Sequence, residues 1–180
     1  MSFPTQEVFI HYGSYDDELR SHPVMKWMEN YAKNIVDSRQ WDKSYSDAGH
    51  TDDFTFQKST GEVVEGGEAA WKAVAEVYSP FSSHFHEPTF VIVWKTDKGY
   101  GMFGTAKLHW NLAVPGDKKG QTGYDGKEWD GVTPGAFKFH YDKDGDSFKI
   151  SRTEIYSDPS AAMVIMMHRG MLKPEDLANM

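Results

Sequence analysis

Cysteine is absent from the 180 residues, which excludes disulfides, a thiol nucleophile and cysteine-ligated zinc. The absence fits a reducing compartment, so we expect a cytoplasmic protein. Basic residues are few: 19 Lys and Arg stand against 27 Asp and Glu, a net charge of −8. Because no Lys/Arg cluster opposes this charge, we expect neither nucleic acid nor an anionic membrane as a partner. No apolar run approaches the ~18 residues of a membrane span, and the N-terminus lacks the order of a signal peptide.

Glycine-rich nucleotide loops and a G-x-S-x-G elbow are also missing, so phosphoryl transfer, dinucleotide redox chemistry and common serine hydrolysis have no support. Chemistry must come from carboxylates, histidines, tyrosines, lysines or hydroxyls. Aromatic residues make up 14% of the chain, and there are nine methionines. This mixture can line an apolar cavity as readily as it can fill a solid core.

The spacing of apolar residues predicts two helices in the first half of the chain. Residues 1–20 have little periodicity, and we interpret them as an N-terminal arm. A single domain over 21–180 then begins with an amphipathic helix over about 22–38, with Pro23 at a helix-start position. A hairpin around 54–64 follows, and a second helix from about 69 ends before Pro80.

The second half of the chain is dominated by extended segments. Together with the helices they predict an α+β fold, a cone-shaped, curved antiparallel sheet that wraps around helices and leaves a pocket between them. A long loop over 115–135, with lone aromatics at Tyr124 and Trp129, separates the second and third segments. The methionine-rich residues 159–177 read as a C-terminal helix that closes the pocket as a lid. The four predicted strands are 89–95, 101–114, 136–141 and 148–157.

His84 and His86 flank Phe85, so in an extended segment both imidazoles point to the same side. Such a pair indicates a metal site, one general acid/base with a helper, or structural histidines. A metal would need a third ligand, and Glu87 should point the other way. Asp37 lies at the end of the first helix, where a negative charge is unfavourable, which hints at a role. The alternative is an ordinary ion pair of Asp37 with Lys33 or Arg39.

The chain contains several short motifs spread over about residues 22–165. They are Tyr31-Ala32, Asp37-Ser38, Trp41-Asp42, Phe54-Thr55-Phe56, Ser83-His84-Phe85 and Phe139-His140-Tyr141. Together they resemble the scytalone dehydratases and, more widely, the SnoaL-like polyketide cyclases of the nuclear transport factor 2 superfamily. The resemblance implies a cone-shaped α+β barrel with an enclosed pocket, and it supports the fold better than the reaction.

The resemblance also implies roles for individual residues. In the dehydratases an aspartate ending the first helix orients a histidine on a later strand, and these positions match Asp37 and His84. The family's second catalytic histidine falls near Ala106, and its two tyrosines fall near Val36 and Phe56, so those polar groups are replaced. Its asparagine falls near Lys138, which stabilises an enolate if it faces the pocket and is solvated if it faces outward.

We therefore expect a cofactor-free enzyme for cyclisation, isomerisation or dehydration of a polyketide- or terpenoid-like carbonyl compound, in secondary metabolism. His84 would be the acid/base, Asp37 its orienter and His86 a helper. Two other functions remain open: a non-catalytic ligand-binding or interaction module, and a metal-dependent enzyme using His84 and His86. We also expect a homodimer. The expected substrate-binding residues are Trp27, Tyr31, Phe56, Trp71, Trp110, Lys138 and Thr153.

Overall fold

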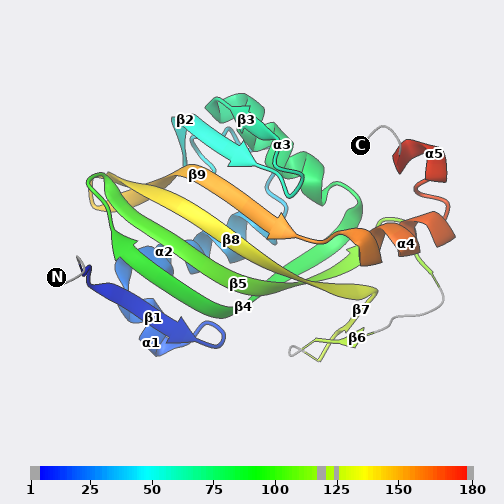
Figure 1. Ribbon diagram of the computed structural model, residues 1–180, viewed down its shortest axis with the longest axis horizontal. Coiled ribbons are helices and arrows are strands. Elements are labelled where there is room, and N and C mark those ends of the chain that lie inside the picture. The colour runs from blue at the N-terminus through cyan, green and yellow to red at the C-terminus, as the bar shows by residue number, and fades with distance from the viewer. Residues whose placement is uncertain (1–4, 117–120, 124–125, 178–180) are drawn as a thin grey trace.

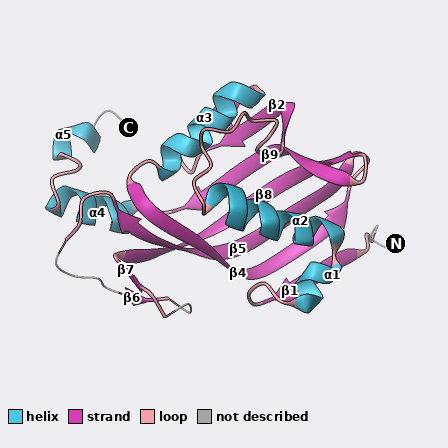
Figure 2. Ribbon diagram, turned by 180° about the vertical axis from the view of Figure 1, so that it is seen from behind, coloured by secondary structure: helices cyan, strands magenta, loops and turns pink. Residues whose placement is uncertain are grey.

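The computed structural model describes residues 5–116, 121–123 and 126–177, so Tyr124 lies outside the described residues. A curved sheet of seven strands carries helices α1, α2 and α3 on one face, here called the inner face, and leaves the other, outer face without helices (Figures 1 and 2). The strand order is β1-β4-β5-β8-β9-β2-β3. The strands are β1 Val8–Tyr12, β2 His50–Gln57, β3 Val63–Glu65, β4 Phe81–Lys95, β5 Gly99–Leu112, β8 Gly131–Asp144 and β9 Ser147–Ser157.

The sheet is mixed, which corrects the expected purely antiparallel arrangement. Strands β4, β5, β8 and β9 pair antiparallel, as do β1 with β4 and β2 with β3. Strand β2, however, runs parallel to β9, with Thr55 opposite Arg152 and Phe56 opposite Thr153. Turn residues in the sequence specify only hairpins between neighbouring segments, whereas β2 and β9 come from distant parts of the chain.

The first long helix has the predicted span but two conformations. The α-helix α2, Pro23–Tyr31, starts with Pro23 after an extended His22, where the missing N–H costs nothing. It continues as a π-helical turn, η1, Ala32–Val36, in which the N–H of Asp37 donates to the carbonyl of Ala32 at 2.8 Å. The other helices are α1 Asp17–Ser21, α3 Gly67–Tyr78, α4 Ser160–His168 and α5 Pro174–Leu177.

Strand β1 and helix α1 lie within the expected N-terminal arm and belong to the fold, so the arm is wrong for this described part of the chain. Strand β1 pairs with β4 along its length, from Val8 opposite Trp94 to Tyr12 opposite Phe90. Helix α1 is capped by Asp16, whose Oδ1 accepts from the N–H of Leu19 at 2.8 Å, and the Leu19 side chain is fully buried. A single short apolar run such as Val8–Tyr12 is too weak a signal beside the longer periodic segments.

The segment 115–135 is less loop-like than expected. Its described residues include a two-stranded hairpin, β6 Gln121–Thr122 with β7 Glu128–Trp129, and its last residues belong to β8. Asp130 is buried and binds the guanidinium of Arg169, just after α4, at 2.6 and 2.8 Å. This ion pair ties the C-terminal helix α4 to the far end of the sheet (Figure 1).

The buried core lies between the inner face of the sheet and the helices, and its largest fully buried side chains include Trp110, Tyr141, Phe54 and Phe56. The break between α4 and α5, at Gly170 with φ 69°, agrees with the sequence. Within the described ranges, no helix has the length and apolarity needed to cross a bilayer.

Candidate functional site

A cavity of about 70 Å³ lies between α2, η1, α3 and the inner face of the sheet. Its wall is mainly apolar and includes Met25, Met28 and Met102, together with the aromatic rings of Phe56, Phe137 and Phe139. Polar groups reach it at few points, among them His86, Tyr78, Tyr31 and Thr153. No described residue of α4 or α5 lines it, so the expected lid does not cover this cavity.

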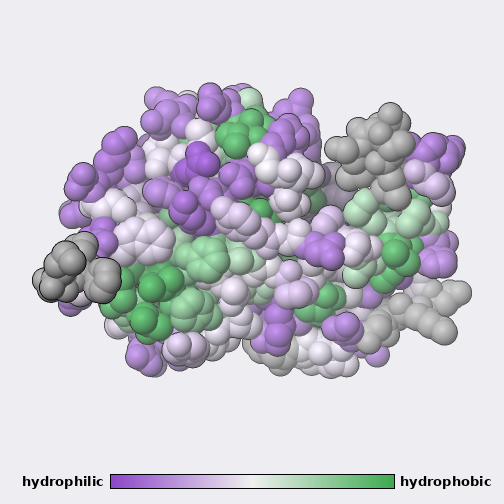
Figure 3. Space-filling view, in the orientation of Figure 1, coloured by the Kyte–Doolittle hydropathy of each residue, from purple (hydrophilic) through white to green (hydrophobic). Residues whose placement is uncertain are grey.

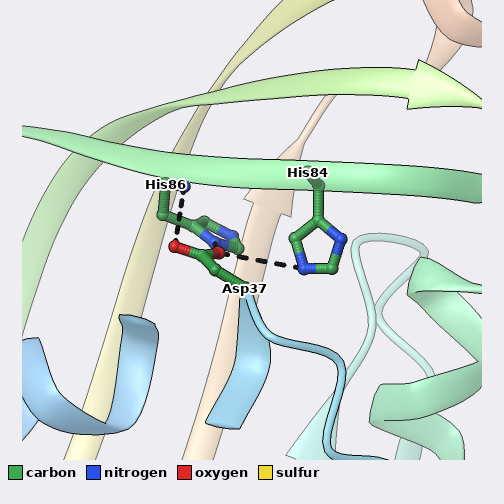
Figure 4. A group of neighbouring side chains, drawn as sticks. All are labelled: Asp37, His84 and His86. Atoms are coloured by element: carbon green, nitrogen blue, oxygen red, sulfur yellow. Dashed lines mark hydrogen bonds and ion pairs between the residues drawn. The ribbon is translucent and has the colours of Figure 1, made fainter. Parts of the chain in front are cut away.

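Asp37 and His86 form a short hydrogen-bonded pair at the wall of this cavity (Figure 4). Nδ1 of His86 lies 2.7 Å from Oδ1 of Asp37, and the backbone N–H of His86 donates to Oδ2 at 3.3 Å. Both side chains are largely buried, with 9% and 12% exposure. The carboxylate thus fixes both the ring and the backbone of this strand position.

The other ring nitrogen of His86 is held by a tyrosine that the sequence analysis did not single out. Nε2 lies 3.1 Å from the hydroxyl of Tyr78, at the end of α3. Burial raises the pKa of Tyr78, so the hydroxyl keeps its proton. A carboxylate only accepts hydrogen bonds, so Nδ1 of His86 donates to Asp37, and in the neutral ring Nε2 then accepts from the Tyr78 hydroxyl. Asp37, His86 and Tyr78 therefore form one polarised chain of hydrogen bonds.

His84 shares the inner face of β4 with His86 but does not line the cavity. Its side chain is fully buried and stacks on Tyr78 and Trp41, with ring centroids 4.5 and 6.3 Å away. Burial, with the charges of His86 and Arg39, lowers the pKa of His84 to about 3, so the ring is neutral. Nε2 lies 3.8 Å from Oδ1 of Asp37, too far for a hydrogen bond.

The end of the first helix aims Asp37 at the sheet. The alternative ion pairs of Asp37 with Lys33 or Arg39 do not form: Lys33 binds Glu29 at 2.6 Å. Arg39, in a left-handed conformation with φ 55°, donates instead to the backbone carbonyls of Tyr78 and Phe81. These bonds join the segment that follows the π-helical turn to the end of α3 and the start of β4. They hold together the three segments that carry Asp37, Tyr78 and the two histidines.

Three of the seven expected substrate-binding residues line the cavity: Tyr31, Phe56 and Thr153. The hydroxyl of Tyr31 lies 3.1 Å from Nε2 of His50, whose Nδ1 donates to the carbonyl of Tyr45 at 3.2 Å. Burial lowers the pKa of His50 to about 4, so this ring is neutral and its Nε2 accepts a hydrogen bond from the hydroxyl of Tyr31. The hydroxyl of Thr153 is buried without a hydrogen-bond partner among the described residues.

The other four expected substrate-binding residues do not line the cavity. Trp71 and Trp110 are core residues whose indole N–H groups bind the carbonyl of Lys43 and the hydroxyl of Thr133, both at 2.9 Å. Trp27 stacks behind Tyr31, with centroids 5.4 Å apart. Lys138 lies on the outer face, where its Nζ binds Glu154 at 3.2 Å. Aromatic identity alone does not distinguish a core residue from a cavity wall.

The cavity hydroxyls lie at positions different from those that the dehydratase resemblance indicated. Val36, Phe56 and Ala106 do line the cavity, but they are apolar. Tyr78 and Tyr15 are cavity residues that the sequence analysis missed. Tyr78 belonged to the apolar stripe of a predicted helix, and Tyr15 fell in the presumed arm. The only sequence signal for Tyr78 was a tyrosine in place of an apolar residue close to the two histidines.

The comparisons with known proteins identify the fold. No family model matches the sequence, and no curated protein matches it. Among solved structures, Aln2 from a Streptomyces species matches with a TM-score of 0.60 at 14% identity, over 84% of this chain and 99% of that one. The chain has a nuclear transport factor 2-like fold.

Two further solved structures share this nuclear transport factor 2-like fold. A putative scytalone dehydratase from Novosphingobium aromaticivorans matches with a TM-score of 0.58 at 11% identity, over 78% of this chain and 85% of that one. The hexachlorocyclohexane dehydrochlorinase LinA-type3 from Novosphingobium barchaimii matches with 0.54 at 14% identity, over 76% and 84%. Distant relatives of the chain in structure thus include proteins named for lyase-type activities.

Proposed function

We propose that the protein is an enzyme that moves a proton on a small, largely apolar carbonyl compound without a cofactor. The outcome would be cyclisation, isomerisation or dehydration of a polyketide- or terpenoid-like molecule. The observation that carries this proposal is the hydrogen-bonded chain from Asp37 through His86 to Tyr78 at the wall of an apolar cavity. Lyase-type names among proteins of the same fold are consistent with it.

His86, rather than the sequence-favoured His84, is the general base in this proposal. His86 lines the cavity and is hydrogen-bonded to Asp37, whereas His84 is sealed behind Tyr78 and Trp41. A carboxylate on Nδ1 keeps the lone pair on Nε2 and stabilises the imidazolium that forms when Nε2 accepts a proton. Asp37 keeps the orienting role that the resemblance implied.

The proton transfer follows from the partners of the two ring nitrogens. A substrate whose carbonyl oxygen accepts a hydrogen bond from Tyr78 releases Nε2 of His86 from that hydroxyl. Nε2 then takes a proton from the carbon next to the carbonyl. The electron pair of that C–H bond forms a C=C bond, and the π pair of the carbonyl moves to the oxygen, where Tyr78 stabilises the charge. Return of the proton from His86 to another atom isomerises the substrate, whereas its transfer to a hydroxyl on the adjoining carbon lets that hydroxyl leave as water and dehydrates the substrate.

The size of the cavity restricts the substrate. About 70 Å³ is well below the roughly 300–1,000 Å³ of a typical ligand pocket. Met25, Met28 and Met102 on the wall have flexible side chains that can make room. Thr153 offers an unpartnered hydroxyl for a second oxygen of the substrate. A compact, mostly apolar molecule with one or two oxygens fits these features best.

Exchange of substrate hydrogen with solvent tests the proposal without knowledge of the natural product. The protein is incubated with a panel of small cyclic ketones in D₂O, and deuterium at the carbon next to the carbonyl is followed by NMR. We expect catalysed exchange that disappears in His86→Ala and persists in Tyr156→Phe, a replacement on β9 outside the cavity. Binding of ketones without exchange by the wild-type protein would instead identify a non-catalytic ligand-binding module.

We also propose that the protein forms a homodimer through its outer face. Exposed apolar side chains gather over β1 and the neighbouring edge of β4 (Figure 3). On β1, Val8 and Ile10 are 41% and 46% exposed, more than is usual for such residues in a sheet. Sedimentation equilibrium of the wild type and of Ile10→Lys tests this: a dimer that the substitution dissociates is expected, and a wild-type monomer contradicts it.

A further inference from the structure

Three ligand atoms converge beside the cavity from two elements that are far apart in sequence. Oδ1 of Asp37 lies 2.7 Å from Nδ1 of His86 and 3.8 Å from Nε2 of His84, and the three side chains place their ligand atoms within 4.8 Å of one another (Figure 4). Asp37 comes from the end of η1, and the histidines come from alternate positions of β4. The third ligand could not be recognised from its spacing to the histidines along the sequence. The fold brings Asp37 to them from the end of a helix.

His84 has no role in the proton transfer proposed above, yet it is a fully buried polar side chain. The backbone carbonyl of Val36 is the one described acceptor that acts on the ring, and its contact is too poorly aligned to count as a hydrogen bond of normal geometry. A buried polar group that lacks well-formed hydrogen bonds is destabilising, and phenylalanine would stack on Tyr78 without that cost. Nε2 of His84 points at Asp37, the carboxylate that already binds His86.

We infer that Asp37, His84 and His86 form a binding site for a divalent transition-metal ion of the zinc class. Two imidazoles and one carboxylate are a common ligand set for Zn²⁺, with metal–ligand distances of roughly 2.0–2.2 Å. Around such an ion, neighbouring ligand atoms lie about 3.4 Å apart. The 2.7 Å contact must therefore open and the 3.8 Å contact must close, each by about half an ångström. The two imidazole nitrogens, which lie within 4.8 Å of each other, must also approach to about 3.4 Å, and side-chain rotation allows these movements.

A bound ion changes what His86 can do. Because the ion takes the lone pair of Nδ1, the ring proton must move to Nε2, which then donates to Tyr78 or to a ligand in the cavity instead of accepting a proton. The metal-bound form therefore lacks the base of the proposed reaction. The two states share Asp37 and His86 and exclude one another. Metal binding also needs His84, which the proposed reaction does not use, so this inference goes beyond the proposed function and does not depend on it.

Direct metal binding tests the inference. The chelator-treated protein is titrated with ZnCl₂ by calorimetry and with CoCl₂ by visible absorption, because tetrahedral Co²⁺ with nitrogen ligands gives intense bands. We expect one ion per chain. His84→Phe keeps a ring between Tyr78 and Trp41 but removes the ligand nitrogen, so zinc should bind at least ~100-fold more weakly. His109→Phe, which removes a histidine from the outer face, is the matched control and should bind like the wild type.

Circular dichroism and thermal unfolding show whether His84→Phe is folded. Asp37→Asn, which keeps the size of the side chain, is the second variant if it is not. Failure of the wild type to bind one equivalent of Zn²⁺ or Co²⁺ overturns the inference, as does unchanged affinity in the folded ligand variants. Hydrogen exchange in ketones, measured with chelator present, judges the proposed reaction separately, so the two proposals can fail independently.

Discussion

The two faces of strand β4 carry similar histidine–carboxylate pairs in different surroundings. On the inner face, His86 binds Asp37 at 2.7 Å; on the outer face, Glu87 binds His109 of β5 at 2.8 Å. The inner carboxylate comes from a helix end, and the inner imidazole meets a tyrosine and an apolar cavity. The outer carboxylate also faces Lys107 at 3.8 Å, and neither Glu87 nor His109 lines the apolar cavity. A short distance between imidazole and carboxylate is therefore not enough to indicate chemistry.

The largest expected difference between the faces is in turnover. His86→Ala should reduce catalysed hydrogen exchange about 10²- to 10⁴-fold, because the base is removed. His109→Ala should leave the exchange rate within about twofold of the wild type, since that ring lies across the sheet from the cavity. Both rates are measured by NMR in D₂O with the same ketone. Equal losses in the two variants would remove the distinction between the faces.

Acid should destabilise the inner side through another buried ring, His50. Burial lowers its pKa from 6.5 to about 4 in the folded protein, whereas the unfolded chain keeps the ordinary value. As the pH falls from 6.5 to 4, the unfolded chain therefore binds this proton first, and the free energy of unfolding decreases by about 3 kcal/mol.

Urea unfolding at several pH values measures this loss of stability. His50→Phe, which keeps an aromatic ring beside Phe54 and Trp71, should remove part of the pH dependence. The exposed His168→Gln, on α4, is the control and should keep the wild-type slope. An unchanged slope in His50→Phe would show that this ring does not titrate as described.

Replacing the carboxylate of each pair by an amide compares the roles of the Asp37–His86 and Glu87–His109 pairs. Asp37→Asn should slow exchange about 10²-fold, because an amide can stabilise the wrong tautomer of His86. Glu87→Gln should leave exchange unchanged and reduce the free energy of unfolding by about 1 kcal/mol, the value of an ordinary hydrogen bond. The exchange rate and the free energy of unfolding are measured for both variants, by NMR in D₂O and by chemical denaturation. Slow exchange in Glu87→Gln would mean that the outer pair is coupled to the reaction.

Tyr78→Phe should have the smallest kinetic effect, about 10-fold. The variant removes one donor to the substrate oxygen and leaves the Asp37–His86 pair in place. If Tyr78 instead only supports the His84 stack, phenylalanine should preserve the exchange rate. Measuring kcat and KM separately tests this, because loss of a donor acting in the transition state lowers kcat.

The periodicity of the sequence predicted most of the architecture, because local signals define most of its elements. The amphipathic pattern from Val24 onward marked the first helix, and alternating residues marked the four long strands. It failed at β1 and at the parallel β2–β9 pair, where the fold depends on pairing between distant segments. No local pattern encodes which strand a short apolar run will join.

The sequence predicted the aspartate and both histidines of the candidate site, but it missed Tyr78 and the pattern of hydrogen bonds among them. Asp37, His84 and His86 were all identified from the sequence, and the structure brings them together. Oδ1 of Asp37 lies 2.7 Å from His86 and 3.8 Å from His84, so a difference of about one ångström decides which imidazole binds the carboxylate. That difference depends on how His84 packs against Trp41 and Tyr78. Alternation along a strand assigns a face to both histidines, and it cannot rank them.

The π-helical turn Ala32–Val36 has a consequence for how the site can be lost. Such a turn winds nearly one more residue into each turn than an α-helix does, so the same five residues wound as α-helix would advance roughly 90° further about the axis. Asp37 would then point away from the sheet although neither it nor either histidine had changed. Substitutions that convert only this turn to α-helix should accordingly abolish the chemistry while conserving the fold.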